Sequence, residues 1–271
     1  MLSVTVFWES KEINQRGALF MKKTLSTIVL ASALLLGTVA PVAANAATVD
    51  GTGGTTKTTA AFTAPKAVTT PVDPDNPDKP STGDNGGNGA TTGSGNLTFL
   101  YVTDALDFGS AQSVTSNTQS LDLSSLSTGS FTDAKVDNAN FVTEISDTRG
   151  TNAGWSVSLS STPMTNSADS DVNTKTLKGA TVDFNGGNEI TKISNSASTT
   201  GITANTVSVP TETAMAKTIY QASADNGAGQ TAFQLAPTNI KLANVGPNTK
   251  TGTYNGTLNW TLSDTPVVPA V

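Results

Sequence analysis

A segment near the C-terminus alternates apolar and polar side chains with a period of two residues. Successive side chains of a β-strand point to opposite faces, so this pattern predicts a strand over residues 253–264 with one dry face and one wet face. A strand of this kind needs a second layer to cover its dry face, which limits the folds open to the chain. The dry face would carry Tyr254, Leu258, Trp260 and Leu262.

A shorter segment upstream repeats this pattern, with Trp155, Val157 and Leu159 on one face. Other short runs rich in Thr, Val and aromatic residues are separated by turn signals such as Asp225-Asn226-Gly227. Closely spaced short strands with half-polar alternation predict an all-β fold, an antiparallel β-sandwich of the Ig-like type. The expected strands cover residues 97–102, 106–108, 119–123, 141–146, 154–159, 177–184, 203–210, 214–222, 231–235, 240–243 and 253–264.

One of these strands has a helical alternative. Within residues 214–222, the spacing of Met215, Ile219 and Ala222 also fits one face of a helical turn. The sequence alone leaves both interpretations of this segment open.

The composition narrows the possible chemistry. The chain of 271 residues has no cysteine and no histidine. It therefore has no Ser-His-Asp or Cys-His catalytic group, no disulfide framework and no zinc site of the usual ligand types. We find no Ser-x-x-Lys, Gly-x-Ser-x-Gly or phosphate-binding Gly-Lys motif, and no carboxylate pair that the sequence alone places at a catalytic separation. We expect a protein that is not an enzyme and needs no cofactor or metal.

The compartment is indicated by a leader that begins with Met21-Lys22-Lys23. An apolar run over Ile28–Val39 follows, and Ala44-Asn45-Ala46 is an Ala-x-Ala cleavage site. These are the three parts of a secretory signal peptide, and the apolar run is shorter than the about 20 residues of a membrane span. We predict translation from Met21, residues 1–20 outside the product, a signal peptide over 21–46, and no membrane insertion after its removal.

The mature chain is acidic. The leader carries four basic and two acidic side chains, so its removal changes the formal charge from −6 to −8. A charge of this sign is poorly suited to nucleic acid or to an anionic membrane. Residues 47–94 are mostly Thr, Gly, Pro, Asp and Asn. Because so few apolar residues cannot offset the entropy of ordering, they predict a disordered linker.

Several spaced motifs occur in order between residues 95 and 266. They are Gly95-Asn96-Leu97, Leu106-Asp107-Phe108-Gly109, Asp147-Thr148-Arg149-Gly150 followed by Gly154-Trp155, Leu177-Lys178-Gly179-Ala180, and a final Tyr254, Leu258, Trp260 and Leu262 frame. In this order they resemble the WxL domain of Gram-positive cell-surface proteins. The first triplet reads Trp155-Ser156-Val157 rather than Trp-x-Leu, which keeps an apolar residue in phase. The resemblance predicts a WxL-like wall-binding domain over 95–266, with a tail over 267–271.

The resemblance also implies a function. WxL proteins are secreted and bind the wall without a covalent anchor, so the expected location is the cell wall surface and the expected partner is peptidoglycan. Other surface proteins of one complex are further expected partners. After Pro266 the sequence has no Leu-Pro-x-Thr-Gly sorting signal or apolar tail, and it has no cysteine for a lipid anchor. We therefore expect the protein to be held by binding alone.

Two interpretations stay open for Trp155 and Trp260. Both share a face with leucines, which favours the core. Alternatively, one or both rings stack on sugar C–H faces, and a half-covered indole can still donate its N–H to a hydroxyl. Within WxL proteins the two motifs are implicated in wall attachment. Tyr254 and Leu262, on the face of Trp260, are then expected at the ligand as well.

Asp147 and Arg149 also have two interpretations. They lie two residues apart on an extended chain and so share a face. Arg149 is the only arginine after the leader. It could tie the strand that ends near Ser146 to the strand that begins at Gly154, or it could bind a stem-peptide carboxylate or a wall phosphate.

Two other functions remain open. The domain could be a protein-interaction subunit, with tryptophans in its core, that a membrane-anchored partner holds at the surface without direct glycan contact. It could instead be a carbohydrate-binding adhesin subunit. Binding of the isolated domain to purified wall, or to soluble glycans, separates these functions from wall attachment.

Overall fold

The computed structural model describes residues 48–81, 93, 95–110, 112–127, 140–185 and 192–267. The predicted signal peptide and residues 1–20 lie outside this part, as do all tail residues after Val267. The chain divides into two units, Met1–Ala61 and Phe62–Val271. In the first unit, β1 (Thr48–Asp50) pairs with β2 (Gly53–Thr55) in antiparallel orientation.

The described part of the second unit is almost entirely β. Three four-stranded sheets have the orders β13-β15-β10-β18, β14-β11-β17-β7 and β12-β16-β9-β5, and every strand pair is antiparallel. The predicted all-β class with antiparallel sheets is therefore confirmed. The strands are β5 (Leu97–Val102), β6 (Ala105–Asp107), β7 (Gln119–Asp122), β8 (Ser125–Ser127), β9 (Phe141–Asp147), β10 (Trp155–Ser161), β11 (Thr181–Asn185), β12 (Lys192–Asn195), β13 (Ile202–Ala204), β14 (Thr206–Pro210), β15 (Lys217–Ala222), β16 (Gly229–Leu235), β17 (Ile240–Val245) and β18 (Leu258–Ser263).

Helical structure is scarce in the described residues. It is limited to a 3-10 turn, Pro237–Asn239, that leads into β17. Where the chain is described, it forms no helix with the length and apolar character needed to cross a membrane.

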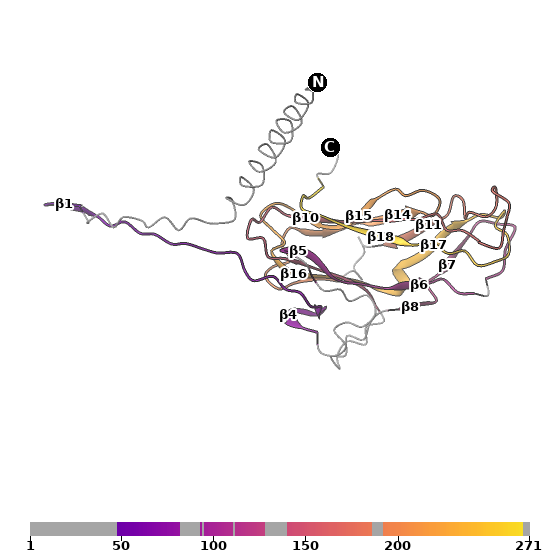
Figure 1. The fold of residues 1–271 in the computed structure, drawn as a ribbon, viewed down its shortest axis with the longest axis horizontal. Coiled ribbons are helices and arrows are strands. Elements are labelled where there is room, and N and C mark those ends of the chain that lie inside the picture. Colours follow the sequence, from indigo (N-terminus) through magenta and orange to yellow (C-terminus); the bar gives the residue numbers. More distant parts are fainter. Residues whose placement is uncertain are drawn as a thin grey trace, which may run out of the picture. The chain divides into compact units, whose positions relative to one another are not determined.

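The core lies between the sheets that contain β9 and β16 on one side and β10 and β15 on the other, which Figure 1 shows as separate layers. The rings of Tyr220 and Phe233 stack across this interface with centroids 4.8 Å apart. Thr143 donates a hydrogen bond of 2.9 Å to the buried hydroxyl of Tyr220. Burial raises the pKa of this tyrosine. The apolar faces of the strands thus pack together, and the polar atom among them is satisfied.

The strand predicted over residues 253–264 is shorter in the structure. β18 begins at Leu258, because Asn255 instead forms an isolated bridge with Thr165. Within β18 the predicted alternation holds: Leu258, Trp260 and Leu262 are half-buried, whereas the intervening side chains are exposed.

Other strand predictions need smaller corrections. The segment 214–222 is a strand from Lys217 onward, which decides against the helical alternative. The single strand expected over 203–210 is two strands in different sheets, because Asn205 turns aside to bond with the backbone of β15. β8 and β12 were not predicted, since both are short and largely polar.

The predicted linker differs from the structure at residues 71–81. Here β3 (Val72–Asp73) and β4 (Asn76–Pro80) form a hairpin that belongs to the second unit and contacts its strands β12 and β16. Pro71, Val72, Pro74 and Pro77 are buried. Local composition predicted disorder, but long-range contacts order this segment: Gln234 of β16 donates a hydrogen bond to the carbonyl of Pro74 at 3.1 Å.

Candidate functional site

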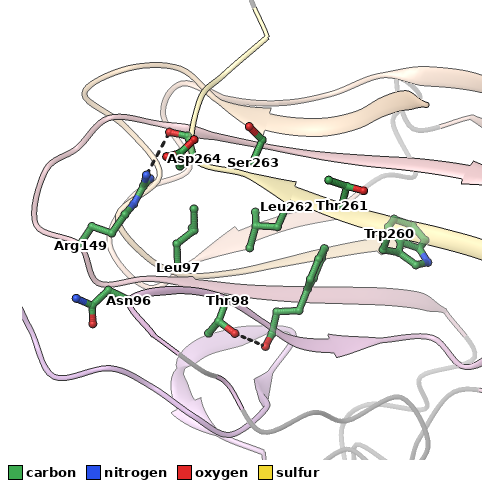
Figure 2. A pocket seen from close by; sticks show the side chains of 10 residues that line it. Asn96, Leu97, Thr98, Arg149, Trp260, Thr261, Leu262, Ser263 and Asp264 are labelled. Atoms are coloured by element: carbon green, nitrogen blue, oxygen red, sulfur yellow. Dashed lines mark hydrogen bonds between the residues drawn. The ribbon is translucent and has the colours of Figure 1, made fainter. Parts of the chain in front are cut away.

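A groove runs between β5 and β18, which are the last strands of their respective sheets. Its volume is about 910 Å³. Because an edge strand has a neighbour on one side only, each of these strands presents an open edge. The groove is lined by Asn96, Leu97, Thr98, Phe99, Arg149, Trp260, Thr261, Leu262, Ser263 and Asp264, and Figure 2 shows these side chains.

The groove combines apolar and polar surface. Leu97 of β5 and Leu262 of β18 lie between the two strands in Figure 2, and both are half-buried. Hydroxyl groups follow the same strands at Thr98, Thr261 and Ser263. The Thr98 hydroxyl donates to the backbone carbonyl of Phe99 at 3.2 Å. Apolar faces with hydroxyls at their margins suit a ligand that itself carries C–H faces and hydroxyls.

Trp260 lies at the boundary between groove and core. Its ring centroid is 5.6 Å from that of Phe141, at an interplanar angle of 30°. The side chain is half-buried, so the core covers only part of the indole. No described residue accepts a hydrogen bond from its N–H. Trp260 therefore has both ring surface and a donor available to a ligand.

Trp155 is in a different environment. It is 0% exposed, and its indole N–H donates to the carbonyl of Gly227 at 2.8 Å. Its ring meets Tyr220 edge to face with centroids 5.6 Å apart. At about 25 cal/mol per Å² of apolar surface, burial of such a ring contributes about 4–6 kcal/mol. This position supports the core interpretation of Trp155 and leaves its ring without access to a ligand.

Arg149 and Asp147 form a tie at one end of the groove. The guanidinium donates from Nε to Oδ1 of Asp147 at 2.9 Å and from Nη2 to Oδ2 at 2.7 Å. It also donates to the carbonyls of Gly154 at 2.6 Å and Asp264 at 3.2 Å. The side chain of Arg149 is 17% exposed and that of Asp147 is 3% exposed. The hydrogen bonds to Asp147 raise the pKa of Arg149.

This arrangement favours the structural interpretation of the pair. The guanidinium connects the end of β9, the start of β10 and the residue after β18, and each of its nitrogens donates a hydrogen bond. Arg149 still lines the groove, so it shapes the groove by holding the end of β18. Asp147 does not line the groove.

A second cavity, of about 1310 Å³, adjoins the groove at Trp260 and Phe99, which line both. Tyr254 lines this cavity and donates from its hydroxyl to the carbonyl of Thr174 at 3.3 Å. Apolar side chains of Leu106, Phe108, Met164 and Leu258 also line it. The two hollows together place Tyr254 and Leu262 on either side of Trp260.

Sequence reasoning missed the contribution of β5. Asn96 and Leu97 belong to a motif that carried the resemblance, but their position beside β18 required the fold. No signal in the sequence pairs these strands, because they belong to different sheets. In the described part of the chain, no cluster of three or more acidic side chains could hold a metal ion.

Comparison with known proteins identifies the family. A family model described as a WxL domain, surface cell wall-binding, matches residues 49–266. This match begins well before the predicted domain start at Gly95 and includes all residues that line the groove. No curated protein and no solved structure matches the chain. Because the model covers more than half of the sequence, the chain belongs to the WxL family of cell-surface, wall-binding domains.

Proposed function

We propose that this chain is a secreted, non-enzymatic protein that attaches noncovalently to peptidoglycan through the groove between β5 and β18. This proposal rests mainly on the position of Trp260, which is half-buried and lies where the groove meets the second cavity. The family is one of wall-binding domains, which supports this assignment. Trp155 has no part in ligand contact, because it is fully buried.

The groove offers two kinds of contact to a glycan. The ring of Trp260, extended by Leu262, meets the C–H face of a sugar. The hydroxyls of Thr98, Thr261 and Ser263 exchange hydrogen bonds with sugar hydroxyls, directly or through water. Contacts of this kind are individually weak. Retention at the surface therefore depends on rebinding, because a domain that dissociates finds many equivalent ligands nearby in the wall.

The first experiment mixes the mature chain, residues 47–271, with washed peptidoglycan sacculi from which teichoic acid has or has not been removed. Sedimentation separates the bound and free protein. We expect wild type to pellet with bare peptidoglycan, and Trp260→Ala to bind about 30-fold more weakly, as for an aromatic hot spot. Asn259→Ala is the matched control, since this neighbouring side chain is exposed and does not line the groove.

Two results would contradict the proposal. A folded Trp260→Ala variant that binds like wild type would remove the groove from wall recognition. Wild-type protein that stays in the supernatant would exclude direct peptidoglycan binding by this domain. Binding to soluble glycans but not to purified wall would instead indicate the adhesin function.

A specific observation favours the alternative of a protein-interaction subunit. β5 and β18 are edge strands on either side of the groove, and an edge strand can pair with an extended segment of another protein. In this alternative a membrane-anchored surface protein occupies the groove and holds the chain. It predicts that wild type remains soluble with sacculi and that Trp260→Ala loses the protein partner.

Export has its own test. The leader over 21–46 requires that the protein recovered from the cell surface begins at Ala47. Mass spectrometry of its N-terminal peptide measures this directly. An N-terminus at Met1 or Met21 in the surface fraction would exclude the predicted cleavage.

A further inference from the structure

The β3–β4 hairpin covers the outer face of the sheet β12-β16-β9-β5. Along β9, Phe141, Thr143 and Ile145 face the core, so Val142 and Glu144 face outward beneath the hairpin. Glu144 is directly opposite Ala232 of β16 and Tyr101 of β5 in the strand register. An acidic side chain thus lies in the middle of a covered sheet face.

Glu144 is incompletely satisfied in this position. It is 0% exposed, and its Oε2 accepts a hydrogen bond of 3.0 Å from the backbone N–H of Val72 in the hairpin. Its Oε1 is buried and has no hydrogen-bond partner among the residues that the structure describes. No cation pairs with it among the described residues. A buried carboxylate with one unpaired oxygen is costly, whereas a neutral carboxyl is much less so.

The charged groups around Glu144 do not compensate it. On the hairpin, Asp73 adds a second negative charge nearby, and Asp75 is paired with Lys192 of β12. Gln234 of β16 is neutral and donates to Asp75 at 2.9 Å. The titratable side chain on β5 is Tyr101, which is opposite Glu144 in the strand register. Tyr220 lies on the core side of β9. Among the described residues, β4 also carries Asp78 and Lys79, and both are exposed.

The protonation equilibrium follows from this environment. Burial raises the pKa of Glu144 to about 8, against the lowering effect of the Val72 hydrogen bond and with a further increase from Asp73. With the hairpin detached, water would restore the ordinary value of 4.5. The docked state therefore binds the proton more tightly. Its stability is fully present below pH 4.5, is lost progressively as the pH rises, and levels off above about 8.

We propose that the β3–β4 hairpin is a pH-dependent latch, closed over the neutral form of Glu144 and loosened when this carboxyl loses its proton. Release gives Glu144 access to water and uncovers Val142 and Tyr101, which form a small apolar cluster of their own on this face. The contacts of Pro74 and Asp75 with β12 and β16 do not involve Glu144. They set the baseline stability of the latch rather than its dependence on Glu144.

Hydrogen exchange of the mature chain, measured by mass spectrometry between pH 4 and 9, tests the latch. The quantity is the protection factor of segment 70–81, corrected for the intrinsic pH dependence of exchange. We expect wild-type protection to fall by up to about tenfold per pH unit between 4.5 and 8 and then to level off. Glu144→Gln, which stays neutral, should show nearly constant protection over this range.

Ser194→Ala is the matched control. It removes a neutral contact with the carbonyl of Pro74, so protection should fall at every pH while the slope of wild type is kept. Protection of β10 and β15 reports whether the core stays folded. Wild-type protection that does not change with pH would overturn the proposal even if Glu144→Gln failed to fold. An equal slope in wild type and a folded Glu144→Gln variant would overturn it as well.

Discussion

Trp155 and Trp260 lie in neighbouring strands and have similar sequence contexts, yet they occupy different environments. β10 and β18 pair directly, with Leu159 opposite Trp260. β10 is flanked by β15 and β18, so Trp155 is enclosed, whereas β18 ends its sheet and leaves Trp260 half-buried. Alternation along a strand decides which face a side chain occupies. The position of the strand in its sheet decides how deeply the side chain is buried.

Replacement of the enclosed tryptophan, Trp155, should have the largest effect, on the stability of the fold. Trp155→Ala should lower the free energy of unfolding by about 3–5 kcal/mol, because it leaves a cavity and deprives the Gly227 carbonyl of its donor. Urea unfolding followed by circular dichroism measures it. Trp260→Ala should cost less, since its side chain is only partly buried and leaves a smaller cavity. Equal losses of unfolding free energy would show that the position of the strand in its sheet does not determine what its tryptophan contributes to stability.

Replacing Arg149 tests what holds the edge strand in place. Arg149→Lys keeps the charge but loses the planar group that reaches Asp147, Gly154 and Asp264 together. We expect a loss of about 1–3 kcal/mol in unfolding free energy. We also expect the variant to exchange its β18 amides faster than wild type does, with a smaller increase in β10. Unchanged exchange in β18 would mean that its pairing with β10 alone fixes its position.

Much of this contrast could be predicted, and part of it could not. The period-two pattern located the half-buried face of β18 at Leu258, Trp260 and Leu262. The pair Asp147 and Arg149 was recognised as a possible tie to Gly154. The depth of Trp155 was not predictable, because burial depends on strand order and strand order follows from long-range pairing.

The same reason explains two other omissions. Thr98 of β5 and Asn96, which precedes this strand, line the groove only because two sheets bring their open edges together. Residues 71–81 look disordered by composition, and they are ordered by contacts with Glu144 and Gln234, which are distant in the sequence. Local patterns carry no information about such partners.

Removal of the Trp260 indole N–H should have an effect of intermediate size on wall binding. Trp260→Phe keeps an aromatic face but removes the available donor, so sedimentation with sacculi should show binding reduced by about three- to tenfold. The loss should be smaller than for Trp260→Ala. Binding as weak as that of the alanine variant would show that the N–H, rather than ring stacking, dominates recognition.

The smallest effects are expected at two exposed residues of the edge strand, Asn259 and Thr261. Neither substitution by Ala should change the unfolding free energy by more than about 0.5 kcal/mol, as is usual for exposed positions. Thr261 lines the groove and Asn259 does not, so only Thr261→Ala should weaken sedimentation with peptidoglycan, by about two- to fivefold. Because the two residues share a strand and similar exposure, any difference between them comes from the groove itself. If both variants bind like wild type, the hydroxyl of Thr261 contributes nothing measurable to recognition, and the polar contacts of the groove must come from Thr98 and Ser263.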